Sequence, residues 1–196
     1  MAPTSSDSSA QTILSLEQQS LLLQIAQKSI LFTLEHGQKM KLIAEDYPEA
    51  LQQHRASFVT LRLNRELRGC IGTLEAYRPL VVDVAHNAHA AAFSDPRFLP
   101  VAASEYENLE YHISILNPAE EMDVHSEEAL LRQLRPGIDG LIIQDGAHRG
   151  TFLPSVWEQL PTPEQFIQQL KLKAGLSPKH WSPTIQVWRY TTTAFP

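Results

Sequence analysis

Hydrophobic positions recur along the first part of the chain at the spacing of an α-helix. Between Ser15 and Gly37, apolar residues return every three to four positions, which predicts a long amphipathic helix. Ser15 with Gln18 three positions later is typical of a capping box, and a glycine such as Gly37 commonly follows a helix end. The stretch 38–56 mixes polar and apolar residues around a proline, so we expect a surface connection with one helical turn there.

Apolar and polar residues alternate in the next part of the chain. Residues 57–63 and 67–77 both show this two-residue period and are separated by a polar stretch, which predicts a β-hairpin. Residues 78–93 are rich in alanine and carry Pro79 where the first turn of a helix accepts proline, which predicts a helix. The following "SDPRF", residues 94–98, should end that helix, because a proline disfavours helical geometry in the residue before it.

Predicted helices and strands follow one another through the rest of the chain. Ser126 precedes a helical pattern as an N-cap does, and Asp145 followed by a glycine indicates a tight turn between two apolar runs. We expect a strand at 109–116, a helix at 126–134, a second hairpin at 140–153, a helix at 162–175 and a strand at 184–195.

The order of these elements predicts the fold class. Strands and helices do not alternate strictly, which favours an α+β fold with a mostly antiparallel sheet and flanking helices over a doubly wound parallel sheet. A chain of 196 residues fits a single domain. Residues 1–14 are small and polar, so we expect a disordered tail there and one domain over 15–196.

Composition excludes several classes of function. A net charge of -6 and a pI near 5.7 provide no overall positive field, so we do not expect nucleic acid as a partner. No apolar run approaches the roughly 20 residues of a membrane span, so we expect no membrane partner. The chain has one cysteine and no visible secretion signal, which predicts a cytoplasmic protein.

That cysteine is the first candidate for chemistry. Cys70 lies in "ELRGCIG", two positions after Arg68, and two positions along a strand is the same face. A nearby cation lowers the pKa of a thiol from about 8.5 and makes it a better nucleophile. Gly69 and Gly72 could let a ligand approach the backbone closely. The alternative is that Cys70 is a small core residue and that the glycines make room for a helix.

The segment after the alanine-rich helix is the second candidate. Asp95 precedes a proline and can bond a nearby backbone N–H, which leaves Arg97 beside the aromatic Phe98. Arginine can hold a carboxylate or phosphate through two parallel hydrogen bonds, so Arg68 and Arg97 together could form a pocket for an anion. Structural salt bridges of both arginines are the alternative.

Histidines could supply a base or a metal ligand. His112, in the strand 109–116, and His148, in the turn of the second hairpin, are the candidates for a base beside the thiol. His86 and His89 stand three positions apart on one helix face, but no further ligand accompanies them, so we predict no metal site. The sequence contains no phosphate loop or dinucleotide fingerprint, so the cofactor is left unassigned.

Several of these motifs together resemble the AMMECR domain family, whose prokaryotic members are called AmmeMemoRadiSam system protein A. The resemblance covers nearly the whole chain after the tail and rests on "LRGCIG" at 67–72, "DPRF" at 95–98, "FLP" with a following valine, and "KAGL". It implies an α+β domain of a larger and a smaller lobe with a cleft between them. It also implies a system with a Memo-like protein and a radical SAM enzyme as partners.

The resemblance supplies no reaction, so two hypotheses follow. In the first, the chain handles a small anionic or nucleotide-like ligand at a cleft site around Cys70, where Arg68, Gly69, Gly72, Asp95 and Arg97 bind it. In the second, the chain is a non-catalytic domain whose "LRGCIG" strand shapes a groove for a Memo-like or radical SAM protein. Whether the chain is an enzyme is left open between them.

Overall fold

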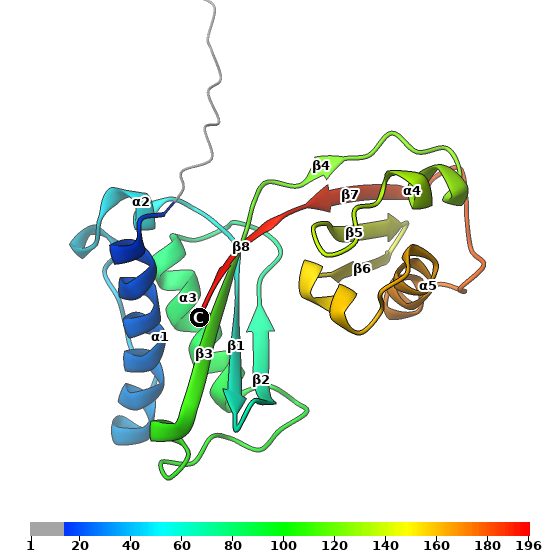
Figure 1. Ribbon diagram of the computed structural model, residues 1–196. Coiled ribbons are helices and arrows are strands. Elements are labelled where there is room, and N and C mark those ends of the chain that lie inside the picture. The colour runs from blue at the N-terminus through cyan, green and yellow to red at the C-terminus, as the bar shows by residue number, and fades with distance from the viewer. Residues whose placement is uncertain (1–13) are drawn as a thin grey trace, which may run out of the picture. The chain divides into compact units, whose positions relative to one another are not determined.

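The computed structural model describes residues 14–196 (Figure 1). These residues form two compact units: unit 1 holds the chain up to Ser114 together with Phe195 and Pro196, and unit 2 holds Ile115–Ala194. The predicted tail falls on residues 1–14, of which 1–13 lie outside the described residues. Leu14, which lies inside them, is 3% exposed.

The strands of unit 1 belong to a four-stranded sheet with the strand order β2-β1-β3-β8, in which the end of β3 from Ile115 and most of β8 fall within the residue range of unit 2. Helix α3 packs against β1 and β2, and α1 packs against α3 (Figure 1). The elements are α1 (Leu16–His36), η1 (Ala44–Asp46), α2 (Glu49–Gln52), β1 (Ser57–Leu63), β2 (Glu66–Gly72), α3 (Leu80–Phe93), η2 (Tyr106–Asn108), β3 (Leu109–Leu116) and β8 (Thr192–Phe195).

The hairpin of β1 and β2 has a tight turn and an irregular register. Asn64 and Arg65 have φ values of 54° and 69°, the left-handed geometry of a two-residue hairpin turn. The antiparallel pairing shifts by one residue between Leu61 and Arg62, which leaves Arg68 of β2 opposite no residue of β1. This bulge directs Arg68 independently of the regular alternation on the rest of β2.

Alternate residues of the strands form the core of unit 1 with the inner faces of the helices. The predicted capping box is present, since Ser15 and Gln18 exchange side-chain and backbone hydrogen bonds, and Gly37 ends α1 in the left-handed conformation. Inside the core, the hydroxyl of Ser29 donates to the carbonyl of Ala85 across the two helices at 2.7 Å. Fully buried apolar residues include Leu22, Ile25, Ile30, Val59, Leu61, Leu80, Val84 and Ile113.

Unit 2 has a second four-stranded sheet, with the order β4-β7-β5-β6 and antiparallel pairing throughout. Helix α5 packs against β6, and its Phe166 stacks on Trp157 with ring centroids 3.9 Å apart. The elements are β4 (Glu120–Glu121), α4 (Glu127–Gln133), β5 (Gly140–Asp145), β6 (His148–Phe152), η3 (Pro154–Glu158), α5 (Pro163–Lys173) and β7 (Gln186–Tyr190).

The α+β class, with flanking helices and mostly antiparallel sheets, is confirmed by this architecture. The last strand is a correction: residues 184–195 form two strands in different sheets, because the chain leaves β7 at Tyr190 and joins β3 as β8 from Thr192. His148 begins β6 instead of lying in the turn. The single-domain boundary at 15–196 and the cleft between two lobes stay predictions.

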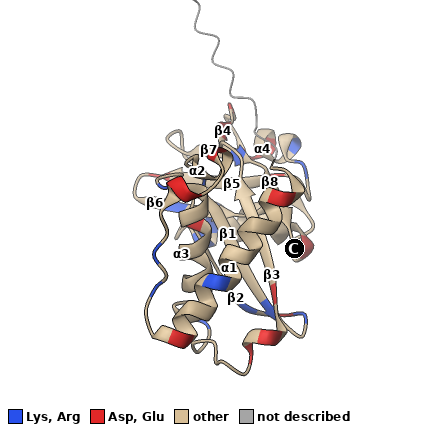
Figure 2. Ribbon diagram, turned by 90° about the vertical axis from the view of Figure 1, so that its left-hand side faces the viewer, with Lys and Arg blue, Asp and Glu red and all other residues tan. Residues whose placement is uncertain are grey.

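Acidic and basic positions are interspersed over the ribbons on the side viewed in Figure 2. None of the helices within residues 14–196 combines the length and apolar character that a membrane span requires.

Candidate functional site

Cys70 lies on β2, opposite Thr60 of β1. Its neighbour Gly69 faces α3, since a side chain on Gly69 would meet the carbonyl of Ala91, so alternation turns Cys70 toward the opposite face of the sheet. The thiol is partly buried, and its Sγ lies 3.1 Å from the Oγ1 of Thr60. Gly69 thus makes room for α3, as the structural alternative has it, whereas Cys70 itself is only partly buried and lies on the other face.

The "DPRF" segment binds both backbone groups of Cys70. The Cys70 N–H donates to Oδ2 of Asp95 at 2.9 Å, and the Cys70 carbonyl accepts from Nη2 of Arg97 at 3.3 Å. Because β2 is the edge strand of its sheet, these two groups point away from β1 and would otherwise lack a strand partner. Asp95 and Arg97 thus close the sheet edge at the cysteine.

Asp95 and Arg97 also form an ion pair with each other. Arg97 donates from Nε and Nη2 to the two carboxylate oxygens of Asp95, at 2.9 and 2.7 Å. This bidentate contact, with smaller help from the backbone N–H groups of Cys70 and Arg97, lowers the pKa of Asp95 to about 2 against the cost of burial. The pKa of Arg97 is raised, chiefly by its hydrogen bond to Asp95.

Arg97 keeps part of its hydrogen-bonding capacity. Its side chain is 53% exposed, whereas Asp95 is 4% exposed. Within the described part of the chain, Nη1 makes no hydrogen bond, while Nε and Nη2 are occupied by Asp95 and Cys70. The guanidinium therefore presents one free nitrogen to solvent beside the cysteine.

Arg68 makes a structural ion pair, which was the alternative to an anion pocket. Its Nε and Nη2 donate to the carboxylate of Glu105 at 2.7 and 2.9 Å, and its Nη1 donates to the carbonyl of Leu99 at 3.0 Å. The pKa of Glu105 is lowered, chiefly by Arg68. Phe98 lies within 6.0 Å of the Arg68 guanidinium and 5.4 Å of that of Arg97, so the structure brings both arginines to one ring.

The two glycines serve close packing. A Cβ on Gly69 would lie 2.1 Å from the Ala91 carbonyl oxygen, so glycine permits α3 to approach β2. A Cβ on Gly72 would lie 2.2 Å from the ring of Phe58, which covers this position. Both positions therefore fit the packing alternative, while a role of the two glycines toward a ligand stays a prediction.

The histidines named as candidates lie at separate places. His112 is on β3, next to β1 in the sheet, whereas Nδ1 of His148 in unit 2 lies 3.2 Å from the carbonyl of Ala174. Nδ1 of His89 lies 3.0 Å from the hydroxyl of Thr33. Burial is the main cause that lowers the pKa of both His86 and His89. Across residues 14–196, no three His, Cys, Asp or Glu side chains gather as a metal site would require.

The sequence-based reasoning missed a buried carboxylate on α3. Asp83 is 1% exposed and accepts hydrogen bonds from the N–H and hydroxyl of Ser57, at 2.9 and 2.6 Å. It also accepts from the hydroxyl of Thr73, from Nε of Arg78 and from the side-chain amide of Asn87. An aspartate inside an apolar helical run was the available signal, since an unpaired carboxylate would not be buried there.

Comparison with known proteins supports the resemblance stated above. The sequence model of the AMMECR1 family matches residues 23–195. The chain belongs to the AMMECR1 family. The matched range includes Arg68, Cys70, Asp95 and Arg97, so the geometry around the cysteine lies inside the AMMECR1 domain.

Relatives of this AMMECR1 domain occur in archaea and bacteria. Protein MJ0810 of Methanocaldococcus jannaschii is 37% identical over 79% of this chain and 79% of its own length. A protein of Thermofilum pendens is 35% identical over 93% of this chain and 91% of its own length. A protein of Thermotoga maritima is 38% identical over 77% of this chain and 83% of its own length.

The fold of the AMMECR1 domain also has a solved counterpart. The crystal structure of the uncharacterized protein PH0010 from Pyrococcus horikoshii matches with a TM-score of 0.81 and 32% sequence identity, over 89% of this chain and 88% of that chain. The names of these relatives give no activity, so the function is argued from the site.

Proposed function

We propose that the AMMECR1 domain binds a small anionic ligand at Cys70, with the thiol in contact with the ligand and Arg97 supplying the positive charge. The observation that carries the proposal is the attachment of Cys70 at both backbone groups by Asp95 and Arg97, next to a guanidinium that is 53% exposed. A fixed cation beside a fixed thiol is the arrangement that anion binding at a cysteine requires.

The residues have separate roles in this proposal. Cys70 and Nη1 of Arg97 contact the ligand, and the hydroxyl of Thr60, 3.1 Å from the sulfur, orients the thiol. Asp95 is a positioning residue, because its carboxylate fixes both the Arg97 guanidinium and the backbone of Cys70. Arg68, Gly69 and Gly72 enter as positioning residues too, since Glu105, Ala91 and Phe58 occupy their surroundings.

Two alkylating reagents of similar size and different charge test this proposal. Iodoacetate is an anion and iodoacetamide is neutral, and the chain has a single cysteine, so each rate reports Cys70 alone. We expect the ratio of the iodoacetate rate to the iodoacetamide rate to exceed that of free glutathione, because Arg97 attracts the anionic reagent. Arg97→Gln should lower the ratio, and 0.5 M salt should lower it in the wild type.

A matched arginine provides the control. Arg62 lies on the neighbouring strand β1 and donates to the carbonyl of Arg65, so Arg62→Gln removes the same charge without touching the "DPRF" segment. Arg97→Lys should retain most of the ratio because the charge is kept. Native protein that resists both reagents while unfolded protein reacts would overturn the proposal, and so would equal ratios in wild type and Arg97→Gln.

A second function, docking of a protein partner, is favoured by one observation. Leu99 is 83% exposed and Leu67 is 40% exposed, near the edge strand and the Arg68 contacts. Exposed apolar side chains that gather in one patch mark interaction surfaces, and these two leucines are linked through Arg68, which follows Leu67 and bonds the carbonyl of Leu99. The partner would be a Memo-like protein or a radical SAM enzyme, and the domain would work in the cytoplasm. Leu99→Ser should then abolish co-purification with such a partner, while Cys70→Ser should leave it intact.

A further inference from the structure

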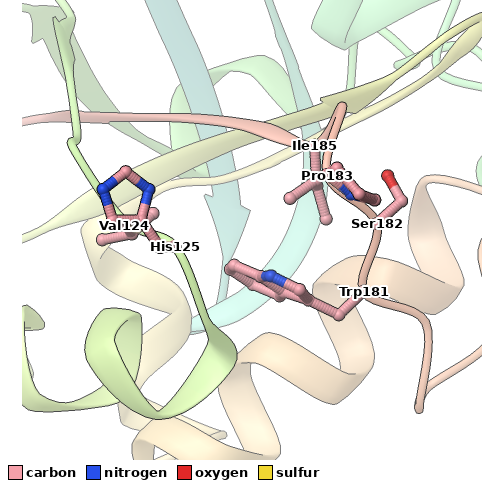
Figure 3. A pocket seen from close by; sticks show the side chains of 6 residues that line it. All are labelled: Val124, His125, Trp181, Ser182, Pro183 and Ile185. Atoms are coloured by element: carbon pink, nitrogen blue, oxygen red, sulfur yellow. The ribbon is translucent and has the colours of Figure 1, made fainter.

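A hollow of about 440 Å³ opens on unit 2, far along the chain from Cys70. Two chain segments enclose it: Val124 and His125 on one side, and 181–185 on the other (Figure 3). In the close-up, the indole ring of Trp181 lies between these segments. The lining residues are Val124, His125, Trp181, Ser182, Pro183 and Ile185.

The wall formed by residues 181–185 is fixed by a single carboxylate. Asp145, at the end of β5, accepts hydrogen bonds from Nε2 of His180 at 2.6 Å, the hydroxyl of Ser182 at 2.7 Å and the hydroxyl of Thr184 at 2.8 Å. These three contacts, His180 first, lower the pKa of Asp145 to about 2, so the carboxylate stays ionised at all ordinary pH values. The wall is thus held in place before any ligand arrives.

Trp181 is fixed independently from inside the unit. The ammonium of Lys171 lies 5.6 Å from the centre of the indole ring. Lys171 is fully buried on α5, and its Nζ bonds the carboxylate of Glu127 at 2.6 Å and the carbonyl of Pro178 at 3.3 Å. Because the ammonium has both an acidic partner and a carbonyl, it holds the ring without contributing a free charge to the hollow.

The groups that remain available in the hollow define a ligand class. Val124, Pro183 and Ile185 supply apolar contact, and Trp181 supplies an aromatic surface. Within residues 14–196, Nε1 of Trp181 has no hydrogen-bond partner and is not enclosed in the interior, so it remains a donor. The Ser182 hydroxyl is occupied, since it donates to Asp145 and accepts from the N–H of Thr184 at 3.2 Å.

We propose that this hollow binds a neutral, planar aromatic molecule of one or two rings that accepts a hydrogen bond from Nε1 of Trp181. The hollow's volume is in the usual range of small-molecule sites, about 300–1,000 Å³. Planar rings stack favourably on indole, and walls that are already ordered lose little freedom on binding. Anions are disfavoured, because the lining contains no lysine or arginine, the imidazole of His125 lies 3.5 Å from the carboxylate of Asp123, and Asp145 lies behind the wall.

Three small probes separate the parts of this proposal. 1-Indanone is neutral, planar and aromatic and carries a carbonyl acceptor. Indane has the same rings without the acceptor, and camphor has a carbonyl on a compact, non-planar frame. We expect 1-indanone to shift the Trp181 indole N–H signal in a ¹⁵N-resolved NMR titration, indane to bind about fivefold more weakly for want of the hydrogen bond, and camphor not to bind.

Two tryptophan variants give the matched comparison. Trp181→Phe keeps an aromatic ring and removes the N–H donor. It should therefore lower the affinity for 1-indanone about fivefold and leave the affinity for indane unchanged. Trp188→Phe is the control, because Trp188 lies on β7 of the same unit outside the lining. It should change neither affinity, and it assigns the indole signals. Both variants should retain the wild-type melting temperature within a few degrees.

The outcomes decide the proposal on their own. An unshifted Trp181 signal at millimolar 1-indanone would overturn it, as would equal binding of camphor or equal 1-indanone affinity in wild type and Trp181→Phe. If Trp181→Phe melts early, the comparison of 1-indanone with indane on the wild type still decides the role of the N–H. None of these measurements involves Cys70, so failure here leaves the alkylation test unaffected.

Discussion

The backbone N–H of Cys70 donates to the carboxylate of Asp95, 25 positions further along the chain, at 2.9 Å. The same carboxylate receives Arg97, so one buried group joins the edge strand to the segment that follows α3. The "LRGCIG" and "DPRF" motifs are therefore two halves of one hydrogen-bonded structure. This relationship makes the two motifs testable together.

Asp95→Asn should destabilise unit 1. The amide keeps the size of the side chain but cannot accept from both Arg97 nitrogens and the Cys70 N–H at once, so we expect a loss of about 1–3 kcal/mol. Chemical denaturation followed by circular dichroism measures this. Asp123→Asn is the control, because Asp123 is 92% exposed and pairs only with an exposed histidine. Equal stability of the two variants would show that the Asp95 contacts contribute nothing.

Acid should weaken both units over the same pH range. The pKa values of Asp95 and Asp145 are lowered to about 2, below the ordinary carboxyl range. Each carboxylate therefore stabilises the fold above about pH 4, and this contribution is lost as the pH falls from about 4 to 2. Melting temperatures between pH 2 and 7 measure the loss. Asp95→Asn and Asp145→Asn should each flatten the acid limb, and an unchanged limb in both would contradict the assignment.

Arg68→Lys should lower the free energy of unfolding and leave the preference of Cys70 for the anionic reagent unchanged. Lysine keeps the charge but cannot make the bidentate contact with Glu105 while also bonding the carbonyls of Leu99 and Pro100, so we expect a loss of about 1 kcal/mol. Glu105→Gln should give a similar loss. Urea denaturation measures both, and the two-reagent alkylation ratio should be unchanged. A lowered ratio at full stability would instead place Arg68 among the ligand contacts.

Gly69→Ala should destabilise the protein more than Gly37→Ala, although Gly37 is the glycine with a positive φ. Its methyl group would meet the backbone of Ala91, which cannot move without displacing α3, so we expect a loss of about 1–3 kcal/mol or more. Gly37→Ala is the comparison, since Gly37 has a φ of 68° and open space around it, and should lose about 1 kcal/mol through backbone strain alone. Thermal melts of both variants separate collision from strain.

Asp83→Asn should be the most severe change among these. It leaves Arg78 without a carboxylate and presents amide hydrogens to the buried Ser57 and Asn87 groups, so a loss of about 3–5 kcal/mol is expected. Because this variant could fail to fold, Thr73→Val provides a milder test of about 1 kcal/mol. If both variants were soluble and as stable as the wild type, the hydrogen bonds of Asp83 would not contribute to the stability of unit 1.

Local patterns predicted most elements of this fold. The capping box at Ser15, the N-cap at Ser126 and the Asp145-Gly146 turn each act within a few residues, and each appears where expected. The division of 184–195 between two sheets was not predictable, because residues on both sides of Thr191 are equally suited to a strand. The choice depends on which sheet edge is available, and that is not a local property.

The candidate site shows the same limit. The resemblance to the AMMECR domain family placed Cys70, Asp95 and Arg97 in one site, and the structure joins these residues by hydrogen bonds. The sequence could not show that Arg68 makes a bidentate hydrogen bond to Glu105. That partner is 37 positions away, and the bulge in β2 redirects the Arg68 side chain. Spacing in sequence reports faces of regular elements, and a bulge interrupts that rule.

The strand order β2-β1-β3-β8 has a consequence for the synthesis of the protein. Three strands and all the helices of this sheet come from the first 116 residues, while the fourth strand is Thr192–Phe195. Because the ribosome adds residues from the N-terminus, the outer edge of β3 stays unpaired until the four residues of β8 have emerged. The strands β4 to β7 of the second sheet are made during that time. An unpaired strand edge can pair with another chain, so the risk of aggregation during synthesis lasts until β8 is available to pair with β3.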